Sequence, residues 1–251
     1  MYGNIGMHTH LLHTQALSTG HRTGSAQSGQ AQALHQGLDL SLNAGELMLL
    51  VGRNGIGKSV LLRTLAGIHP PLTGTIHIKG QNIAELDEPR RAACVSMVLA
   101  TPPQELRLTV MEVVLSGRFR FAKGLIPYRS ADREAAQTMM DLIGINGWEN
   151  RTFQSLSDGE KQKVMLARCW AQDTPLILLD EPLAFLDYPS RKEFLGQLNR
   201  LCQHSGKAAI YSSHDLSLSL LHCHKVLHLK TGSYSVYQDP SALSGDQWMH
   251  D

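Results

Sequence analysis

The order of apolar and polar residues predicts strands that alternate with helices along much of the chain. Residues 38–42 alternate between leucine and polar side chains, and residues 47–51 form a continuous apolar run, which is typical of a strand covered on both faces. The stretch KSVLLRTLAG, residues 58–67, has the apolar spacing of a helix and stops at Gly67. Residues 75–78 alternate again, so a short strand is expected there.

Two stretches depart from this pattern. Residues 18–37 are rich in Gly, Ser and Gln, which predicts a loop or a mobile hairpin tip. Residues 101–154 are mostly helical in pattern, and one helix is expected to start at the N-cap Ser130 and to end at the C-cap Gly144. We interpret the region from about 101 to 165 as a helical subdomain inserted in a single α/β domain that spans residues 1–251.

The last third of the chain returns to alternating strands and helices. Short apolar strands are expected within DTPLILLDEP (residues 173–182) and AAIYSSHDL (residues 208–216), with a helix at residues 190–203 between them. Strands separated by helices predict a sheet that is mainly parallel, because parallel neighbours need crossover connections.

One loop has the composition needed to bind phosphate. Residues 52–59, GRNGIGKS, fit the phosphate-loop pattern and lie between a predicted strand and a predicted helix. Glycines there let backbone N–H groups turn toward phosphate oxygens, and the helix adds the positive end of its dipole. Lys58 would neutralise the β- and γ-phosphates, while the Ser59 hydroxyl would bind Mg²⁺. The expected nucleotide-binding residues are Gly52, Arg53, Asn54, Gly55, Ile56, Gly57, Lys58, Ser59 and Val60.

Three polar residues at the ends of predicted strands complete a candidate catalytic site. Asp180 and Glu181 follow an apolar strand, and His214 follows another. In a parallel sheet these ends face the ligand crevice, so Asp180 could hold Mg²⁺ through water, Glu181 could polarise an attacking water and His214 could touch a γ-phosphate. Each residue alone would suit a solvated turn or a cap, and the phosphate loop favours the catalytic interpretation.

Composition and charge exclude several other classes. The 23 basic and 22 acidic residues nearly balance, which argues against nucleic-acid binding. No apolar run reaches the ~18 residues of a membrane span, and the N-terminal residues make a poor signal peptide. The four cysteines form no CxxC pair, so we expect a reducing compartment and neither disulfides nor a zinc site. We interpret the cluster at residues 222–224, His-Cys-His, as ordinary.

A second polar loop before a helix, LSDGE at residues 156–160, completes a set of five motifs. The phosphate loop is followed by LSDGE, then LILLDEP, then FLD at residues 185–187, and then the histidine of YSSHD. In these motifs and their order the chain resembles the nucleotide-binding subunits of ATP-binding cassette (ABC) transporters over nearly its whole length. The resemblance implies a P-loop NTPase core, an antiparallel β subdomain near the N-terminus, and ATP with Mg²⁺ as ligands.

The same resemblance implies a head-to-tail dimer of two copies. Ser157 and the backbone of Gly159 would bind the γ-phosphate of ATP held by the phosphate loop of the other copy, and Asp187 would be the aspartate of the D-loop. Two residues of the signature depart from the family's usual LSGGQ. Glu160 replaces the commoner Gln, and Asp158 replaces a Gly and adds a negative charge, so we expect Asp158 to point away from the phosphates.

Two other positions also depart from the family pattern. Ala100 stands where these proteins usually carry a Gln that touches Mg²⁺ and the attacking water, and Gln104 is the candidate replacement. The alternative is coupling through backbone and packing alone. No Tyr lies between Tyr2 and the phosphate loop to stack on adenine, so His21 is the candidate ring, with a histidine of no such role as the alternative.

We therefore expect an ATPase that powers transport. The chain is similar to cassettes that import ferric siderophores, haem or vitamin B12. Its expected partners are a second copy, transmembrane permease subunits docked near residues 101–120 and, indirectly, a substrate-binding protein, with no nucleic acid. The expected location is peripheral, on the cytoplasmic face of the inner membrane. Two alternatives stay open. The chain could be the ATPase of an exporter, or a soluble ABC ATPase of an assembly or repair process.

Overall fold

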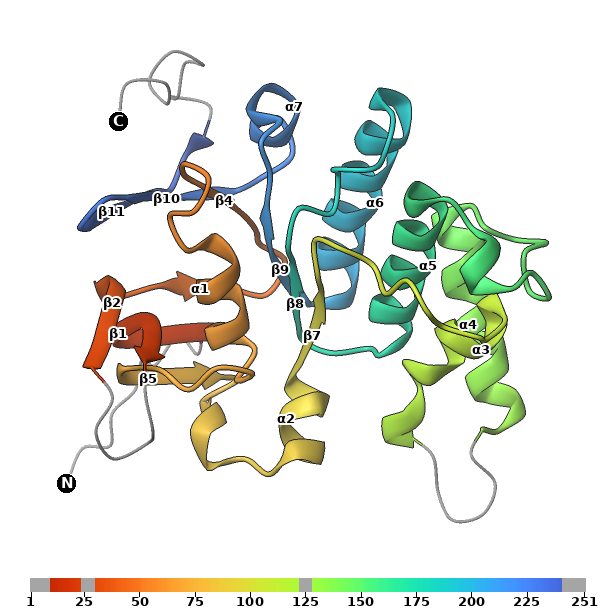
Figure 1. Cartoon of the computed structure of the whole chain (residues 1–251), viewed down its shortest axis with the longest axis horizontal. Coiled ribbons are helices and arrows are strands. Elements are labelled where there is room, and N and C mark those ends of the chain that lie inside the picture. The colour runs from red at the N-terminus through yellow and green to blue at the C-terminus, as the bar shows by residue number, and fades with distance from the viewer. Residues whose placement is uncertain (1–9, 24–29, 122–127, 241–251) are drawn as a thin grey trace.

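The computed structural model describes residues 10–23, 30–121 and 128–240, which form two β-sheets flanked by helices (Figure 1). The larger sheet has six strands, and the smaller one has five strands and lies at the N-terminal side. The larger sheet runs in the order β11 (Ser233–Tyr237), β10 (Lys225–Lys230), β4 (Leu47–Val51), β9 (Ala208–Ser212), β8 (Leu176–Leu179) and β7 (Val95–Val98).

The larger sheet is parallel except at one edge, as the alternation of strands and helices predicts. Strand β10 pairs in parallel with β4, β4 with β9, β9 with β8, and β8 with β7, whereas β11 returns antiparallel to β10. The carboxyl ends of β4, β8 and β9 therefore meet at one edge of the sheet. Ligands of such sheets bind at this edge.

Strand β4 explains the continuous apolar run in the sequence. Leu47, Leu49 and Val51 belong to the core on one face of the sheet, and Met48 and Leu50 belong to the core on the other. All five side chains are buried because both faces are covered. The burial of each leucine contributes about 1.5–3 kcal/mol, so this strand is a firm base for the loop that follows it.

The smaller sheet is antiparallel and consists of β1 (Leu12–Thr23), β2 (Gln30–Leu38), β3 (Ser41–Leu42), β5 (Thr73–Ile78) and β6 (Gln81–Asn82). The prediction of a loop for residues 18–37 is wrong for the described part of that stretch, which belongs to β1 and β2. Residues 24–29 of the predicted hairpin tip lie outside the described residues.

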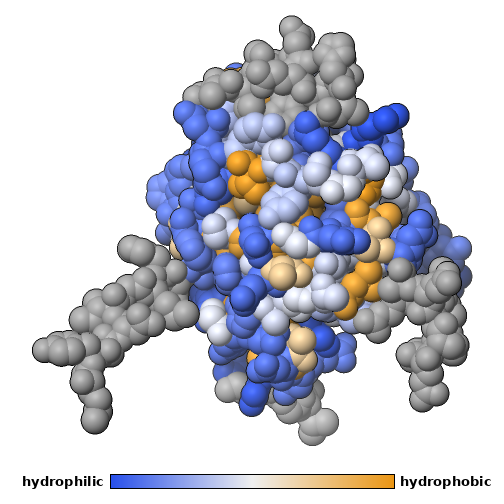
Figure 2. Space-filling view, turned by 90° about the vertical axis from the view of Figure 1, so that its left-hand side faces the viewer, coloured by the Kyte–Doolittle hydropathy of each residue, from blue (hydrophilic) through white to orange (hydrophobic). Residues whose placement is uncertain are grey.

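Cross-strand pairing explains why this polar stretch forms strands. Gly20 pairs with Ala33 so closely that a Cβ on Gly20 would lie 2.1 Å from the carbonyl oxygen of Gln32. Because glycine has no Cβ, the two backbones can approach closely here. Composition alone does not reveal this role of the glycine. Figure 2 looks onto the side of the molecule where β1, β2 and β11 lie, and there small hydrophobic groups are set among mostly hydrophilic side chains.

Helices cover the larger sheet and connect its strands. Helix α1 lies between the two sheets, α6 follows β8, and α3, α4 and α5 pack together on the side away from the smaller sheet (Figure 1). The helices are α1 (Lys58–Leu65), α2 (Glu88–Cys94), α3 (Val110–Ser116), α4 (Ser130–Ile143), α5 (Asp158–Ala171), α6 (Tyr188–Ser205) and α7 (Leu216–Leu220), and the short 3₁₀ turns are η1 (Ile83–Glu85), η2 (Phe119–Phe121) and η3 (Phe153–Ser155).

The predicted helix ends are mostly confirmed. Gly144 caps α4 in the left-handed conformation with φ 75°, and Gly67, with φ 69°, lies two residues past the end of α1. Ser130, predicted to be the N-cap, is instead the first residue of α4, and the N-cap is Arg129. Within the three described ranges, no helix combines the length and the apolar character required to cross a membrane.

Candidate functional site

The phosphate loop joins the buried strand β4 to helix α1 at the edge where the parallel strands end. Gly52, Gly55 and Gly57 have φ of 151°, 78° and 108°, values that side chains with a Cβ rarely adopt. Gly57 is also the N-cap of α1, and no side chain caps this helix end. The first N–H groups of α1 are therefore left to a ligand, and the helix dipole makes that end favourable for an anion.

Lys58 lies across the mouth of this loop. Its Nζ donates to the carbonyl oxygens of Gly52 at 2.9 Å and Arg53 at 3.4 Å, and lies 4.0 Å from Oε1 of Glu181. Burial lowers the pKa of Lys58, and the nearby carboxylates of Glu181 and Asp180 oppose that shift. The ammonium group is thus aimed into the loop and can exchange backbone oxygens for phosphate oxygens.

Asp180 is fixed at the end of β8 as the sequence predicts. The residue is 2% exposed, and its Oδ1 accepts a hydrogen bond from the Ser212 hydroxyl at 3.0 Å. Its backbone N–H donates to the carbonyl of Val98, at the end of the neighbouring strand β7, at 2.9 Å. A buried carboxylate held from two neighbouring strands has the chemistry and rigidity that could hold a hard cation.

Ser212 is a site residue that the sequence reasoning missed. Its hydroxyl also accepts a hydrogen bond from the backbone N–H of Glu181 at 2.8 Å, so one oxygen orients two adjacent acidic residues. Ser212 is the last residue of β9, and the two serines that precede His214 were the available signal.

Glu181 is held in an unusual backbone conformation beside His214. Its φ of 50° lies in the left-handed region, which is rare for a residue with a Cβ and is often found at functional sites. Its Oε1 lies 2.8 Å from Nε2 of His214, whose side chain is half exposed. The structure therefore brings together the predicted catalytic residues Lys58, Glu181 and His214.

The phosphate loop borders an open pocket of about 340 Å³. His21, which is exposed on β1, lines this pocket together with loop residues and Glu181. The pocket thus joins a ring from the smaller sheet to the loop of the larger one. That His21 stacks on adenine stays a prediction. The lining residues are His21, Leu34, Asn54, Gly55, Gly57, Lys58, Ser59, Val60 and Glu181.

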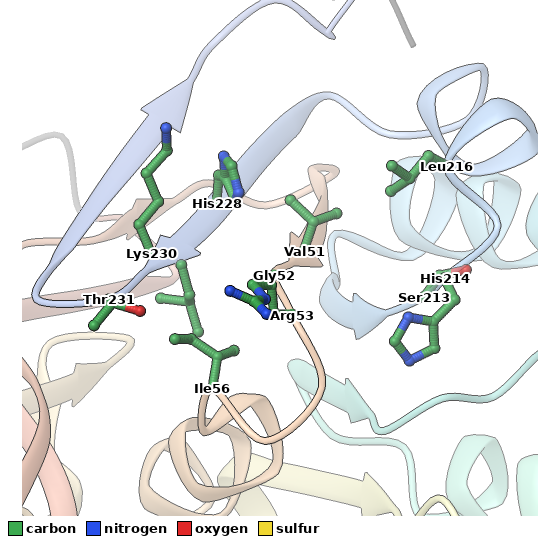
Figure 3. A pocket seen from close by; sticks show the side chains of 11 residues that line it. Val51, Gly52, Arg53, Ile56, Ser213, His214, Leu216, His228, Lys230 and Thr231 are labelled. Carbon is green, nitrogen blue, oxygen red and sulfur yellow. The ribbon is translucent and has the colours of Figure 1, made fainter. Parts of the chain in front are cut away.

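A second recess of about 190 Å³ lies on the other side of the loop, toward β10 (Figure 3). Arg53 from the loop and His214 from the segment after β9 lie on opposite sides of it, and Ile56 and His228 also line it. His214 thus borders this recess while its ring contacts Glu181. The imidazole of His214 thus contacts the carboxylate of Glu181, which lines the first pocket, and also borders the recess on the other side of the phosphate loop.

The second polar loop is organised by a capping box at the start of α5. The Ser157 Oγ accepts from the N–H of Glu160 at 3.3 Å, and a carboxylate oxygen of Glu160 accepts from the N–H of Ser157 at 2.8 Å. Arg151 lies 2.9 Å from the same carboxylate group. The backbone and hydroxyl of Ser157, together with Arg151, lower the pKa of Glu160. Glu160 therefore orders this turn as a charged residue.

The turn at residues 157–160 is remote from the phosphate loop of the same chain. Neither Ser157 nor Gly159 lines the pocket at the phosphate loop, and Figure 1 shows α5 and α1 on opposite sides of β8 and β9. Asp187 caps α6 and accepts from the N–H of Ser190 at 3.0 Å. The side chain of Ser190 and then this N–H lower the pKa of Asp187. One chain thus carries two helix-start turns, the phosphate loop and the Ser157 turn, that do not share a pocket.

Gln104 is directed to α5, and it does not line the phosphate pocket. Its amide donates to the carbonyl of Pro102 at 3.1 Å and to the carboxylate of Asp158 at 3.4 Å. Its carbonyl oxygen accepts from Nζ of Lys161 at 2.9 Å. The side chain therefore connects the loop after β7 to the first turn of α5.

Comparison with known proteins agrees with this arrangement. The profile of the ABC transporter family matches residues 35–184. The chain is 32% identical over 84% of its length to the uncharacterized ABC transporter ATP-binding protein YvrA of Bacillus subtilis, and the match spans only 48% of that relative. It is 37% identical to the hemin import ATP-binding protein HmuV of Gloeobacter violaceus, over 84% of this chain and 78% of that one.

A solved structure shows the same fold. CbiO1 from Clostridium perfringens, part of the ABC transporter complex CbiONQ, superposes with a TM-score of 0.79 at 22% identity. The match covers 95% of this chain and 92% of that one. This likeness, together with the two sheets and the helices of the chain, confirms the predicted α/β class.

Proposed function

The chain belongs to the ABC transporter family, and we propose that it is the ATP-hydrolysing subunit of an importer. The observation that carries the proposal is the group formed by Asp180, Ser212, Glu181 and His214 opposite Lys58. A phosphate loop alone supports nucleotide binding, whereas a buried carboxylate and a second, oriented one beside it supply what hydrolysis needs.

Each residue has a role that its surroundings support. The N–H groups of the loop and Nζ of Lys58 bind the β- and γ-phosphates, and Glu181 accepts a hydrogen bond from the attacking water. His214 holds the carboxylate of Glu181 and borders the space beside the γ-phosphate position. The left-handed backbone of Glu181 fixes the direction of its side chain, so little reorganisation is needed for reaction.

The donor set near Lys58 fits Mg²⁺. Ser59 supplies a hydroxyl at the start of α1, and Asp180 supplies a carboxylate with one oxygen fixed by Ser212. Mg²⁺ prefers oxygen ligands of this kind and keeps several waters. When bound there, the ion would neutralise charge on the phosphate oxygens.

A second copy of the chain completes the site. The turn at Ser157 offers a hydroxyl and the start of a helix, and it is remote from the phosphate loop of its own chain. Two copies arranged head to tail bring Ser157 and Gly159 of each to the phosphate loop of the other. Asp187 is the N-cap of α6 and lies two residues after Phe185, whose carbonyl lies close to Gly159. We assign Asp187 to the contact between the two sites.

The partners follow from exposed apolar side chains near α3. Leu108 and Phe119 flank that helix and are 40% and 71% exposed. We assign residues 101–120 as the docking surface for transmembrane permease subunits, and residues 101–165 as a helical subdomain that moves with them. The cassette is then peripheral, on the cytoplasmic face of the membrane, and a substrate-binding protein acts indirectly through the permease.

The transported molecule is an iron complex, either a siderophore or haem, or vitamin B12. The likeness to HmuV, named for hemin import, supports this class. The test is reconstitution of the chain with the permease that co-purifies with it, in vesicles supplied separately with a ferric siderophore, haem and vitamin B12. ATP-dependent uptake of one of them is expected. Outward transport, or ATP hydrolysis in these vesicles with no uptake of any of the three, would contradict the proposal.

A further inference from the structure

The turn that we assign to the γ-phosphate of a second copy carries a negative charge that needs compensation. Asp158 follows Ser157 directly and is the first residue of α5. A carboxylate suits the start of a helix, but it repels a polyphosphate that approaches the same turn. Its side chain is half exposed and lies close to the surface that would receive ATP.

Two side chains hold Asp158. Nζ of Lys161, one helical turn later, lies 3.7 Å from Oδ1, and the amide of Gln104 donates to the same oxygen at 3.4 Å. Lys161 in turn donates to the carbonyl oxygen of Gln104 at 2.9 Å. The three residues therefore form a closed network, which we name the Gln104 network, in which each member contacts the other two.

Burial makes Lys161 dependent on this network. Its side chain is only 8% exposed, and an ammonium group out of water needs hydrogen-bond acceptors. Gln104, on the loop between β7 and α3, supplies its nearest one. A shift of that loop would remove this acceptor from Lys161 and the amide donor from Asp158. The electrostatic potential of the turn therefore depends on the position of a loop outside α5.

The neighbouring Glu160 is a useful comparison. Its carboxylate is also balanced by a cation, Arg151, but it lies inside the capping box. Residues 151–160 thus balance Glu160 locally, whereas the balance of Asp158 includes a side chain more than fifty positions earlier in the sequence. Of these two carboxylates, only Asp158 joins the turn to the loop after β7.

We propose that the Gln104 network positions and charge-balances the Ser157 turn, so that the loop after β7 controls how well this turn receives the ATP of a second copy. This proposal rests on the proposed function and concerns the regulation of the same site. Gln104 is then a positioning residue that acts on the nucleotide of the partner through Asp158 and Lys161. It does not act as a ligand in its own chain's pocket.

The test measures ATP-driven dimerisation in the Glu181→Gln background, where hydrolysis does not reopen the dimer. Lys161→Met keeps an unbranched apolar stem but removes the cation. We expect the ATP affinity of each dimer site, read from the ATP dependence of dimerisation, to fall about fivefold, which is the upper range for a partly exposed ion pair. Asp158→Asn added to Lys161→Met should restore dimerisation to near the parent value. Gln104→Ala should also weaken dimerisation, but by less than Lys161→Met does.

Rescue by Asp158→Asn separates charge balance from packing. If Lys161 only packs α5, the double variant remains as weak as Lys161→Met, and the proposal is overturned. It is also overturned if Lys161→Met dimerises as the parent does. Lys192→Met, at an exposed lysine of α6, is the matched control and should leave dimerisation unchanged. If the Glu181→Gln parent itself binds no ATP or does not dimerise, the proposed function fails, and that outcome is distinct from a failure of the network alone.

Discussion

The phosphate loop and the Ser157 turn, which both precede helices, are built in opposite ways. The phosphate loop has glycines at positive φ and an uncapped helix start, so its N–H groups are left for a ligand. The Ser157 turn has no residue at positive φ and closes its helix end with a capping box. An uncapped loop gains its hydrogen bonds only when phosphate binds, whereas a capped turn is ordered beforehand.

This structural difference suggests different functional roles for the two turns. The first can hold a nucleotide alone, because Lys58 and the start of α1 converge on one pocket. The second has already used the N–H of Glu160 within its own cap and offers mainly a hydroxyl and a helix dipole. We therefore expect variants of the first turn to impair ATP binding by one chain, and variants of the second to impair only steps that need two chains.

The largest expected effect lies next to the first turn and concerns chemistry alone. Glu181→Gln should lower phosphate release by ~10²–10⁴-fold, because it removes the general base. ATP binding, measured by equilibrium titration of the single chain, should stay close to wild type, and the two turns should remain joined in an ATP-bound dimer. Turnover near the wild-type value would exclude Glu181 from this role.

A smaller effect is expected from the hydroxyl of the second turn. Ser157→Ala should lower hydrolysis by about 10–100-fold, the loss of one hydrogen bond to a charged group, without changing ATP binding by the single chain. It should also lower the free energy of unfolding by ~1 kcal/mol, because the cap of α5 is lost.

The chain offers a matched control for that variant. Thr109 caps α3 with Glu112 in the same kind of capping box, outside both the phosphate loop and the Ser157 turn. Thr109→Ala should cost a similar free energy of unfolding, measured by chemical denaturation, and leave single-chain ATP binding and catalysis by the purified cassette near wild type. If both variants reduce hydrolysis equally, the Ser157 effect reflects helix stability rather than contact with phosphate.

The smallest predicted effect belongs to the adenine end of the first pocket. His21→Ala should raise the KM for ATP by about threefold and leave kcat unchanged, as expected for one lost ring contact worth ~0.5–1.5 kcal/mol. His13→Ala is the control, since His13 is exposed on the same strand and does not line the pocket. An unchanged KM for His21→Ala would favour a histidine without a role in binding.

Sequence patterns predicted the elements that bury their side chains and missed those that depend on pairing. The apolar run of β4 and the loop after it were evident because local residues determine both. Residues 18–37 were misjudged because strands β1 and β2 are stabilised by each other, and Gly20 allows their close approach. Local composition carries no information about that partner.

The site was predictable in its members and less so in its geometry. Asp180, Glu181 and His214 follow strand ends, and a parallel sheet brings such ends together. The backbone of Glu181 and the double role of Ser212 depend on contacts between β8 and β9, which no short motif encodes. The position of Gln104 depends likewise on Lys161, fifty-seven residues later, so the sequence could identify the residue without its direction.

The proposed dimer places each ATP between the phosphate loop of one copy and the Ser157 turn of another. It is tested by mixing a Lys58→Ala chain with a Ser157→Arg chain, both in the Glu181→Gln background, and counting the ATP retained per dimer. Neither parent dimer has an intact composite site. In the mixed dimer the wild-type loop of one chain meets the wild-type turn of the other, and the remaining site carries both defects.

We expect one retained ATP per mixed dimer and none in either parent. If the turn served the phosphate loop of its own chain, each subunit would carry one defect and the mixed dimer would retain no ATP. That result, obtained with Ser157→Arg chains that still bind ATP singly, would contradict the composite site.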